Sequence, residues 1–242
     1  MKLKVMVKIF LFQLVLFFAN TVQAITGFAG TVLAMPPSTY LLGLDNAKVV
    51  LNAMAWVSGL MIAIMNYRYI NWKELAKIVV FMIAGMFAGM EICRVINSDS
   101  TLLTIYGFVI LAIALKNLLV KKETDLPQAA LYLVLLAAGV IHGMFVSGGA
   151  LLVIYAVQVL KDKNEFRATV APVWVVLNTF MMITQYRSGL FTTENVQLIA
   201  VSILPLFLAT WLGGKLAQRL NQNVFLNLTY ILLIISGVSL VF

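Results

Sequence analysis

The sequence HGMFVSGG occupies residues 142–149, in the middle of an apolar block that runs from about 129 to 160. A transmembrane helix needs only about 20 apolar residues, so this block is too long for one ordinary span. Paired glycines interrupt the hydrogen-bond ladder of a helix. The stretch therefore predicts a helix, a break, and then a second helix or half-helix within the same block.

A second block of this design lies near the start of the chain, from about residue 9 to 44, and contains GFAG at 27–30 followed by Pro36-Pro37. Proline also disrupts helices. Such breaks persist in a bilayer only where protein or a water-filled cavity satisfies the freed backbone groups. Six other apolar blocks have the length of ordinary spans: 47–66, 75–96, 100–119, 168–186, 196–218 and 223–242.

The composition indicates that the whole chain lies in a membrane. Of its 242 residues, 62% are hydrophobic and 11% are charged, and the mean hydropathy is +1.01. A soluble domain of this length needs a largely polar surface. We therefore expect an all-α polytopic membrane protein with about 8–10 membrane segments and no soluble catalytic domain.

The net charge is +8, but the Lys and Arg residues lie between the apolar blocks, where they set membrane orientation. The basic composition therefore does not indicate nucleic-acid binding. The single cysteine, Cys93, excludes an internal disulfide and a cysteine metal cage. The single histidine, His142, argues against a zinc site or a multi-histidine haem site. We predict no cofactor and no metal.

The N-terminal residues 1–24 resemble a signal peptide, because Lys2, Lys4 and Lys8 precede an apolar stretch and VQA at 22–24 resembles a cleavage site. The alternative is a retained first helix. We favour retention because the apolar stretch continues past residue 24 and because the internal repeat requires this helix.

The two long blocks begin two halves of similar design. We interpret the chain as one membrane domain of two transmembrane repeats, residues 1–122 and 123–242. A shift of 119 positions aligns Gly30 with Gly149, Asp45 with Asn164, Lys48 with Arg167, and Tyr67-Arg68 with Tyr186-Arg187. A shift of 124 aligns Gly89 with Gly213 and Asn97 with Asn221.

The Lys and Arg residues also indicate how the halves are oriented. If all eight blocks cross once, these residues divide 10 inside to 7 outside. If the fifth block turns back on itself, the division is 14 to 3 with the N-terminus inside; if both long blocks turn back, it is 11 to 6 with the N-terminus outside. The positive-inside rule favours the last two arrangements. Both give inverted-topology repeats with broken or re-entrant helices, a recurrent transporter design.

Each of the two glycine-containing blocks carries a motif. The first is Gly27-Phe28-x-Gly30, then Pro36, LGL at 42–44 and Ala47; the second is Gly139-x-x-x-Gly143, SGGALLV at 147–153 and FRAT at 166–169. Together they resemble the sulfite exporter TauE/SafE family, over nearly the whole chain. The resemblance implies a two-repeat permease of the bacterial inner membrane for sulfite, a sulfonate or another small anion.

A helix that begins inside the membrane exposes unpaired N–H groups and the positive end of its dipole. Two such ends, one from each half, predict a central cage for a small oxyanion. Close helix packing is the alternative role for these small residues. The candidate substrate-binding residues at the breaks are Gly27, Phe28, Gly30, His142, Gly143, Ser147, Gly148 and Gly149.

Four further polar residues are substrate-binding candidates. Lys48 and Arg167 begin the helices that follow the two breaks and could attract an anion from either side; alternatively, they snorkel to the interface and fix the topology. Asn52 and Asn178 are amides inside helices that either line the path or join helices.

Two residues are candidates for proton coupling. Glu91 lies in an apolar helix with Arg94 one turn later, which predicts either a functional carboxylate or an ion pair near the helix end. His142 stands next to the second break and either exchanges protons or bonds a freed carbonyl.

We expect a secondary transporter that moves its substrate by alternating access, with the lipid bilayer as its environment. Proton or sodium coupling and a homodimer are left open. A non-transporting assembly or sensor subunit is the alternative function. An intramembrane enzyme is less favoured, because the nine acidic residues are scattered rather than clustered, and no Walker A sequence indicates ATP use.

Overall fold

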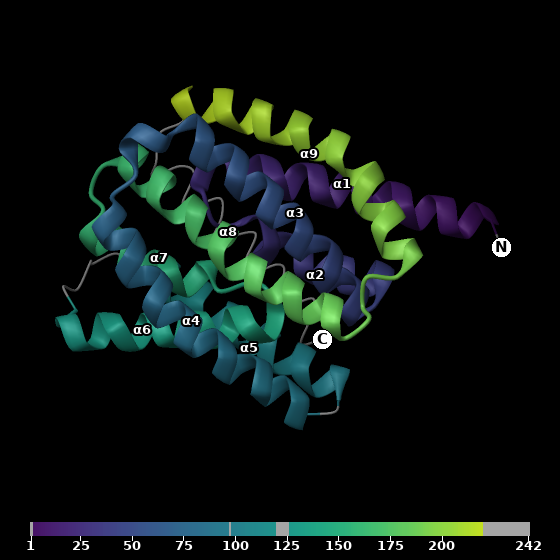
Figure 1. The fold of residues 1–242 in the computed structure, drawn as a ribbon, viewed down its shortest axis with the longest axis horizontal. Helices are drawn as coiled ribbons and strands as arrows, with labels where there is room; N and C mark the ends of the chain where they lie inside the picture. The colour runs from purple at the N-terminus through teal and green to yellow at the C-terminus, as the bar shows by residue number, and fades with distance from the viewer. Residues whose placement is uncertain (1, 97, 120–125, 220–242) are drawn as a thin grey trace.

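The computed structural model describes residues 2–96, 98–119 and 126–219, in which the chain forms nine α-helices and one 3-10 helix and no strand (Figure 1). Six of these helices are long and apolar enough to cross a membrane. The protein is therefore all-α and polytopic, as its composition predicted. The expected block 223–242 lies outside the described residues. The elements are α1 (Lys2–Thr26), α2 (Gly30–Leu42), α3 (Leu44–Met65), η1 (Tyr67–Tyr69), α4 (Trp72–Val95), α5 (Asp99–Leu119), α6 (Gln128–Phe145), α7 (Gly149–Val159), α8 (Lys163–Arg187) and α9 (Thr193–Arg219).

Both long apolar blocks are broken at the predicted glycines. The first break separates α1 from α2, and the second separates α6 from α7. In each break one residue leaves the helix with a positive φ, 86° at Gly27 and 56° at Val146. Glycine adopts this conformation freely, whereas a β-branched residue rarely does. The backbone at Val146 is therefore strained.

Two details of the expected breaks need correction. Pro36 and Pro37 lie inside α2 and do not end it. The fixed φ of proline is compatible with a helix, and the cost is the loss of a hydrogen bond rather than of the helical path. His142 and Gly143 are still helical and belong to α6, so the second break is confined to residues 146–148.

The second broken block forms a helical hairpin. The backbone N–H of Leu126, just before α6, donates to Oε1 of Gln158 near the end of α7 (3.0 Å). Gly148, just before α7, lies against the carbonyl of Ala138 in the middle of α6. Helix α7 therefore runs back along α6, and the block returns to the side from which it entered.

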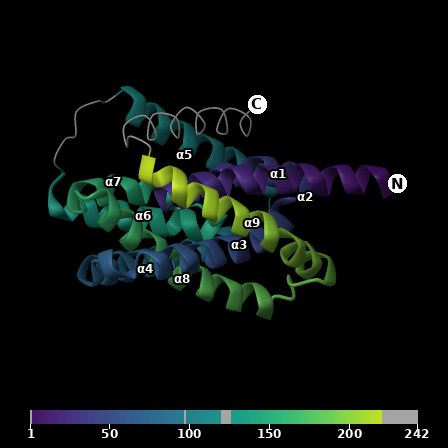
Figure 2. The same ribbon diagram turned by 90° about the horizontal axis from the view of Figure 1, so that it is seen from above.

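The first broken block also turns back. Helices α1 and α9 lie side by side in both views and run in the same direction (Figures 1 and 2). Two contacts in the same order along both helices show this direction: Gln13 with Ser202 (2.9 Å) and Thr21 with Gly213. At the start of α9, Nδ2 of Asn195 donates to Oδ1 of Asn46 at the start of α3 (3.0 Å). Helix α2 has therefore returned to the side on which α1 begins.

The remaining long helices complete this arrangement. Helices α4 and α6 run in the same direction, whereas α3 and α8 run in opposite directions. Consequently α1, α3 and α9 begin at one face, which we call the N-terminal face, and α4, α6 and α8 begin at the other, which we call the basic face. The structure thus matches the arrangement in which both long blocks turn back. Described cations near the basic face include Arg68, Lys73, Lys77, Lys161 and Lys163.

Glycines allow α4 and α6 to make direct backbone contact. Gly85 and Gly89 of α4 each lie against a backbone carbonyl of α6, and Gly139 and Gly143 of α6 each lie against a backbone carbonyl of α4. Small residues four positions apart let membrane helices approach this closely. This contact fixes the α6–α7 hairpin to the rest of the domain.

Filling this contact should destabilise the protein. In Gly89→Val, the new Cβ would meet the backbone carbonyl of Val140, and overpacking of this kind costs about 1–3 kcal/mol. We expect a clearly lower Tm in detergent, measured by gel filtration after heating. Ala88→Val, on the exposed neighbouring position, is the matched control. Equal Tm values for the two variants would contradict the packing described.

Candidate functional site

The two breaks meet in the interior of the domain. Gly149 lies so close to the first break that an added Cβ would be 2.6 Å from the Phe28 carbonyl oxygen. Nε1 of Trp174, on α8, donates to the Gly27 carbonyl oxygen at 2.6 Å. An added Cβ at Gly27 would lie 3.2 Å from the Arg167 carbonyl oxygen. The first break is therefore held between the second break and α8.

Each break exposes the N-terminal end of a short helix. Ala29 precedes α2 and Gly148 precedes α7, and neither offers a side-chain cap to the first turn of its helix. Neither first turn contains an acidic residue. The first N–H groups of a helix have no intrahelical acceptor, and the helix dipole is positive there. Both ends are therefore suited to a negatively charged group.

A chain of buried polar side chains lies beside the breaks. His142 Nε2 is 2.9 Å from Asn178 Oδ1, and Asn52 Nδ2 donates to Gln185 Oε1 at 2.7 Å. All four side chains are buried. They connect α6, α8 and α3, so the structure brings together three of the predicted site residues.

Several polar atoms in this region have no protein partner in the described part of the chain. A buried polar atom without a partner costs about 1–3 kcal/mol, and buried water or a ligand commonly satisfies such atoms. Tyr106 of α5 lies near Ser147, but the geometry of the two hydroxyls does not make a hydrogen bond, so both halves contribute to this set. The unpartnered atoms are Gln23 Nε2, Asn52 Oδ1, Tyr106 Oη, His142 Nδ1, Ser147 Oγ and Asn178 Nδ2.

The sequence did not identify Trp174 and Tyr106 as site residues. Trp174 contacts both halves, because its indole N–H bonds Gly27 and its ring lies 5.4 Å from the His142 ring. Tyr106 stacks on Phe145 at 4.5 Å. Both stand in the middle of apolar helices rather than at the ends, where interfacial aromatic residues occur. That position was the available signal, because buried Trp and Tyr usually need a polar partner.

Arg167 and Lys48 each lie beside the break of the opposite half. Arg167 adjoins Gly27, is half-buried, and its Nε has no partner among the described residues. Lys48 is also half-buried, with Nζ 5.8 Å from the Phe145 ring centre and 4.0 Å from Cys93 Sγ. No described acidic residue forms an ion pair with either cation. Because α8 and α3 begin at opposite faces, the two cations approach the breaks from opposite sides.

Other predicted residues lie against neighbouring helices or at the surface. Gly30 lies against the Gln23 side chain, and Gly143 lies against the Met86 backbone rather than in the break. The position of Gly143 therefore fits close helix packing, the alternative role given above for the small residues. Phe28 packs edge-on against Phe166 at 6.3 Å.

Glu91 lies away from the breaks. Its carboxylate is exposed and forms an ion pair with Arg94 at 2.5 Å. This is the environment expected for an ion pair near a helix end.

The chain matches one known protein family. The family model described as sulfite exporter TauE/SafE matches residues 12–240. Searches of curated proteins and of solved structures found no match. The matched range contains both breaks and every predicted substrate-binding residue.

Proposed function

The chain belongs to the sulfite exporter TauE/SafE family, and from this premise we propose that it moves a small anion by alternating access at the junction of the two breaks. Family membership and the apolar helices make it a multi-pass membrane protein of a transporter family. The proposed substrates are sulfite, a sulfonate, or another organosulfur or small organic anion. The proposed location is the bacterial inner membrane, with the N-terminal face outside.

One observation carries this proposal: two uncapped helix N-termini and a set of unpartnered buried polar atoms lie at the same junction. Unpaired N–H groups, amides and a hydroxyl can replace the hydration shell of a small oxyanion. The first turns of α2 and α7 carry no carboxylate, which would repel the anion. We assign the binding role to Gly27, Ser147, Gly148, Gly149 and Asn178, and an attracting role to Arg167 and Lys48.

The inverted arrangement suggests how the site could open to each side in turn. Three pairs of landmarks are 119 positions apart: Gly27 with Val146, Gly30 with Gly149, and Leu44 with Lys163. This common spacing supports the proposed repeats, residues 1–122 and 123–242. Two hairpins that enter from opposite faces and end at one site fit alternating access.

A thermal-shift screen of the purified full-length protein tests the proposed ligand class. A ligand that binds only the folded protein raises its apparent stability, by about 2.7 kcal/mol when present at 100 times its Kd. We expect a raised Tm with at least one of sulfite, sulfate, thiosulfate, taurine, sulfoacetate and small carboxylates. Stabilisation by none of these anions, and no flux of them into proteoliposomes, would favour the non-transporting assembly or sensor subunit.

A further inference from the structure

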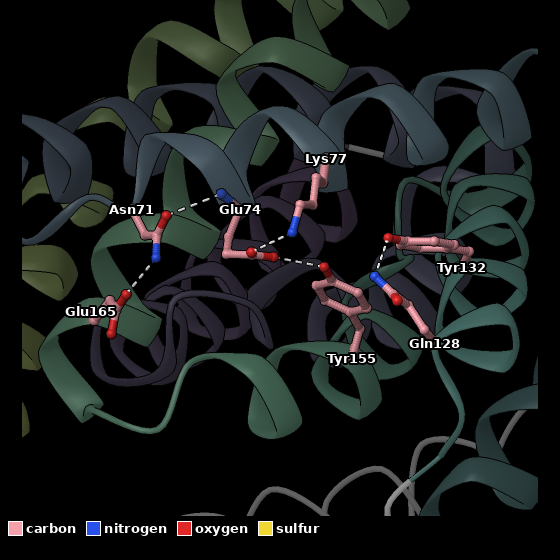
Figure 3. Close-up of polar contacts among 7 residues, drawn as sticks. All are labelled: Asn71, Glu74, Lys77, Gln128, Tyr132, Tyr155 and Glu165. Carbon is pink, nitrogen blue, oxygen red and sulfur yellow. Dashed lines mark hydrogen bonds and ion pairs between the residues drawn. The ribbon is translucent and has the colours of Figure 1, made fainter.

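A polar network joins three helices near the basic face (Figure 3). The Tyr155 hydroxyl, on α7, donates to Glu74 Oε2 on α4 at 2.7 Å. Lys77 Nζ donates to the other oxygen, Glu74 Oε1, also at 2.7 Å. The Glu74 side chain is only 14% exposed. The carboxylate is therefore largely buried, and each of its oxygens accepts one hydrogen bond, one from α7 and one from α4.

The same network reaches α8 through Asn71, which caps α4. Asn71 Oδ1 accepts from the Glu74 backbone N–H at 3.1 Å, and Asn71 Nδ2 donates to Glu165 Oε1 at 2.8 Å. The Asn71 backbone N–H donates to Thr169 Oγ1 at 2.9 Å. Glu74 thus connects α7 to a rigid junction between α4 and α8.

Helix α7 links this network to the proposed anion site. It is an 11-residue helix whose first residue, Gly149, lies against the first break. Tyr155 lies six residues later, about 9 Å along the helix axis at 1.5 Å per residue. Because Tyr155 and Gly149 belong to one short helix, a displacement of α7 at Tyr155 would also displace Gly149.

The charged and titratable groups around Glu74 come from every helix that faces it. On α4 these are Lys73 and Lys77, and on α7 the group is Tyr155. Tyr132 of α6 faces Lys77 and Tyr155. Glu165 of α8 is reached through Asn71.

Protonation of Glu74 would weaken this connection. A proton on Oε1 would oppose the Lys77 ammonium. A proton on Oε2 would reverse the bond to Tyr155 and leave the Tyr155 hydroxyl proton without its acceptor. The bond between Glu74 and Tyr155 then changes from a charge-assisted hydrogen bond to a neutral one, which is roughly half as strong.

The equivalent junction at the N-terminal face cannot respond to protons in this way. Asn195 is the third residue of α9, as Glu74 is the third residue of α4, and its backbone N–H donates to Thr192 Oγ1 at 3.2 Å. Its side chain donates to Asn46 Oδ1. Amides do not titrate, and the carboxylate in the first turn of α9 belongs to Glu194, one residue before the position that corresponds to Glu74.

We propose that the Glu74–Tyr155 contact is a proton-sensitive latch that holds α7 at the anion site, and that proton uptake at Glu74 releases α7 toward the basic face. This inference rests on the proposed transport function for its purpose, but the latch itself can be measured without transport. It assigns proton sensitivity to Glu74 rather than to Glu91.

Hydrogen exchange of the α7 amides tests the latch directly in the full-length protein. At pH 7.5, Glu74→Gln and Tyr155→Phe should each reduce the protection of α7 amides by roughly tenfold, the effect of losing one charge-assisted hydrogen bond. Both carboxylate oxygens accept from donors that favour the ionised form, so the acid arm is set at about pH 3.5, below the ordinary pKa of a glutamate. Wild type at that pH, after correction for intrinsic exchange, should resemble Glu74→Gln. The matched control is Glu91→Gln, which removes an exposed carboxylate from α4, the helix that carries Glu74. Its α7 protection should equal that of wild type at both pH values.

Radiolabelled sulfite flux in proteoliposomes gives the second readout. Sulfite itself titrates in this range, so each variant is compared with wild type at the same pH. The ratio of Glu74→Gln flux to wild-type flux should change with pH, whereas the ratio for Glu91→Gln should stay constant. Unchanged α7 protection in both Glu74→Gln and Tyr155→Phe, or in wild type at low pH, would overturn the latch. An intact exchange response without sulfite flux would instead count against the proposed substrate and leave the latch supported.

Discussion

Gly149→Leu is expected to abolish anion flux by locking the junction between the two breaks. An added Cβ would lie 2.6 Å from the Phe28 carbonyl oxygen and 3.3 Å from the Phe28 Cβ, and neither backbone can retreat without moving a hairpin. Overpacking costs of about 1–3 kcal/mol correspond to a change of roughly 5- to 150-fold in an equilibrium constant, since about 1.4 kcal/mol is a factor of ten. The added side chain would also occupy the proposed anion site. We therefore expect the flux to be reduced by the largest factor of that range or to fall below detection.

Two companion variants distinguish the site from general packing. Val159→Leu, which adds bulk at the exposed end of the same helix, should leave flux unchanged. Ser147→Ala removes a buried hydroxyl that has no hydrogen-bond partner in the part of the chain that the structure describes, so stability should not fall, whereas anion affinity should fall several-fold. Wild-type flux in both Gly149→Leu and Ser147→Ala would exclude the proposed site even if the protein transports.

Arg167→Gln is expected to raise the KM for the anion by roughly 10- to 100-fold, the range for one charge-assisted hydrogen bond of about 1.5–3 kcal/mol. Arg167 is half-buried beside Gly27 and forms no ion pair among the described residues. Its positive charge is therefore available to the substrate. The effect should be largest when the anion is supplied at the basic face, where α8 begins, and should diminish at high salt.

Arg187→Gln provides the matched control for this prediction. Arg187 is exposed at the other end of the same helix, so its loss should leave KM unchanged. The measurement is initial flux against anion concentration in proteoliposomes of known protein orientation. Equal KM values for Arg167→Gln and wild type would show that Arg167 serves only to anchor the helix at the membrane interface.

The sequence predicted the positions of both breaks because glycine and block length are local signals. It did not predict that Val146 would take the positive φ in the second break, although the repeat alignment places Val146 opposite Gly27. A strained valine is held by the surrounding helices rather than by its own preference. The sequence also predicted that Pro36 and Pro37 would disrupt the helix, but both lie inside α2. Here too the surrounding structure outweighs the local preference of the residue.

The membrane orientation could be predicted only in part. Charge alone favoured either of two arrangements over eight single crossings, because moving one broken block changes which loops face each side. The packing of α1 along α9 in the same direction distinguishes them, and its Gln13–Ser202 bond joins residues that are 189 positions apart. Contacts of this kind depend on how helices assemble and leave no local pattern in the sequence.

The site was predicted incompletely for a related reason. Residues of the breaks were found because they are glycines and polar groups inside apolar blocks. Trp174 and Tyr106 were missed because their roles depend on Gly27 and Ser147, which come from other helices. Gly143 matched the motif but faces Met86, and sequence alone does not show which way a helical residue points.

The pairing of α1 with α9 and of α4 with α6 has a consequence for biogenesis. Each of these pairs joins one helix of the first proposed repeat to one of the second. During synthesis α1 enters the membrane first, yet its main neighbour, α9, is the last described helix to emerge. Helix α1 therefore completes its packing only after α9 has been synthesised. A fragment that ends before α6 would lack the main packing partner of both α1 and α4, so we expect it to be less stable than the whole chain.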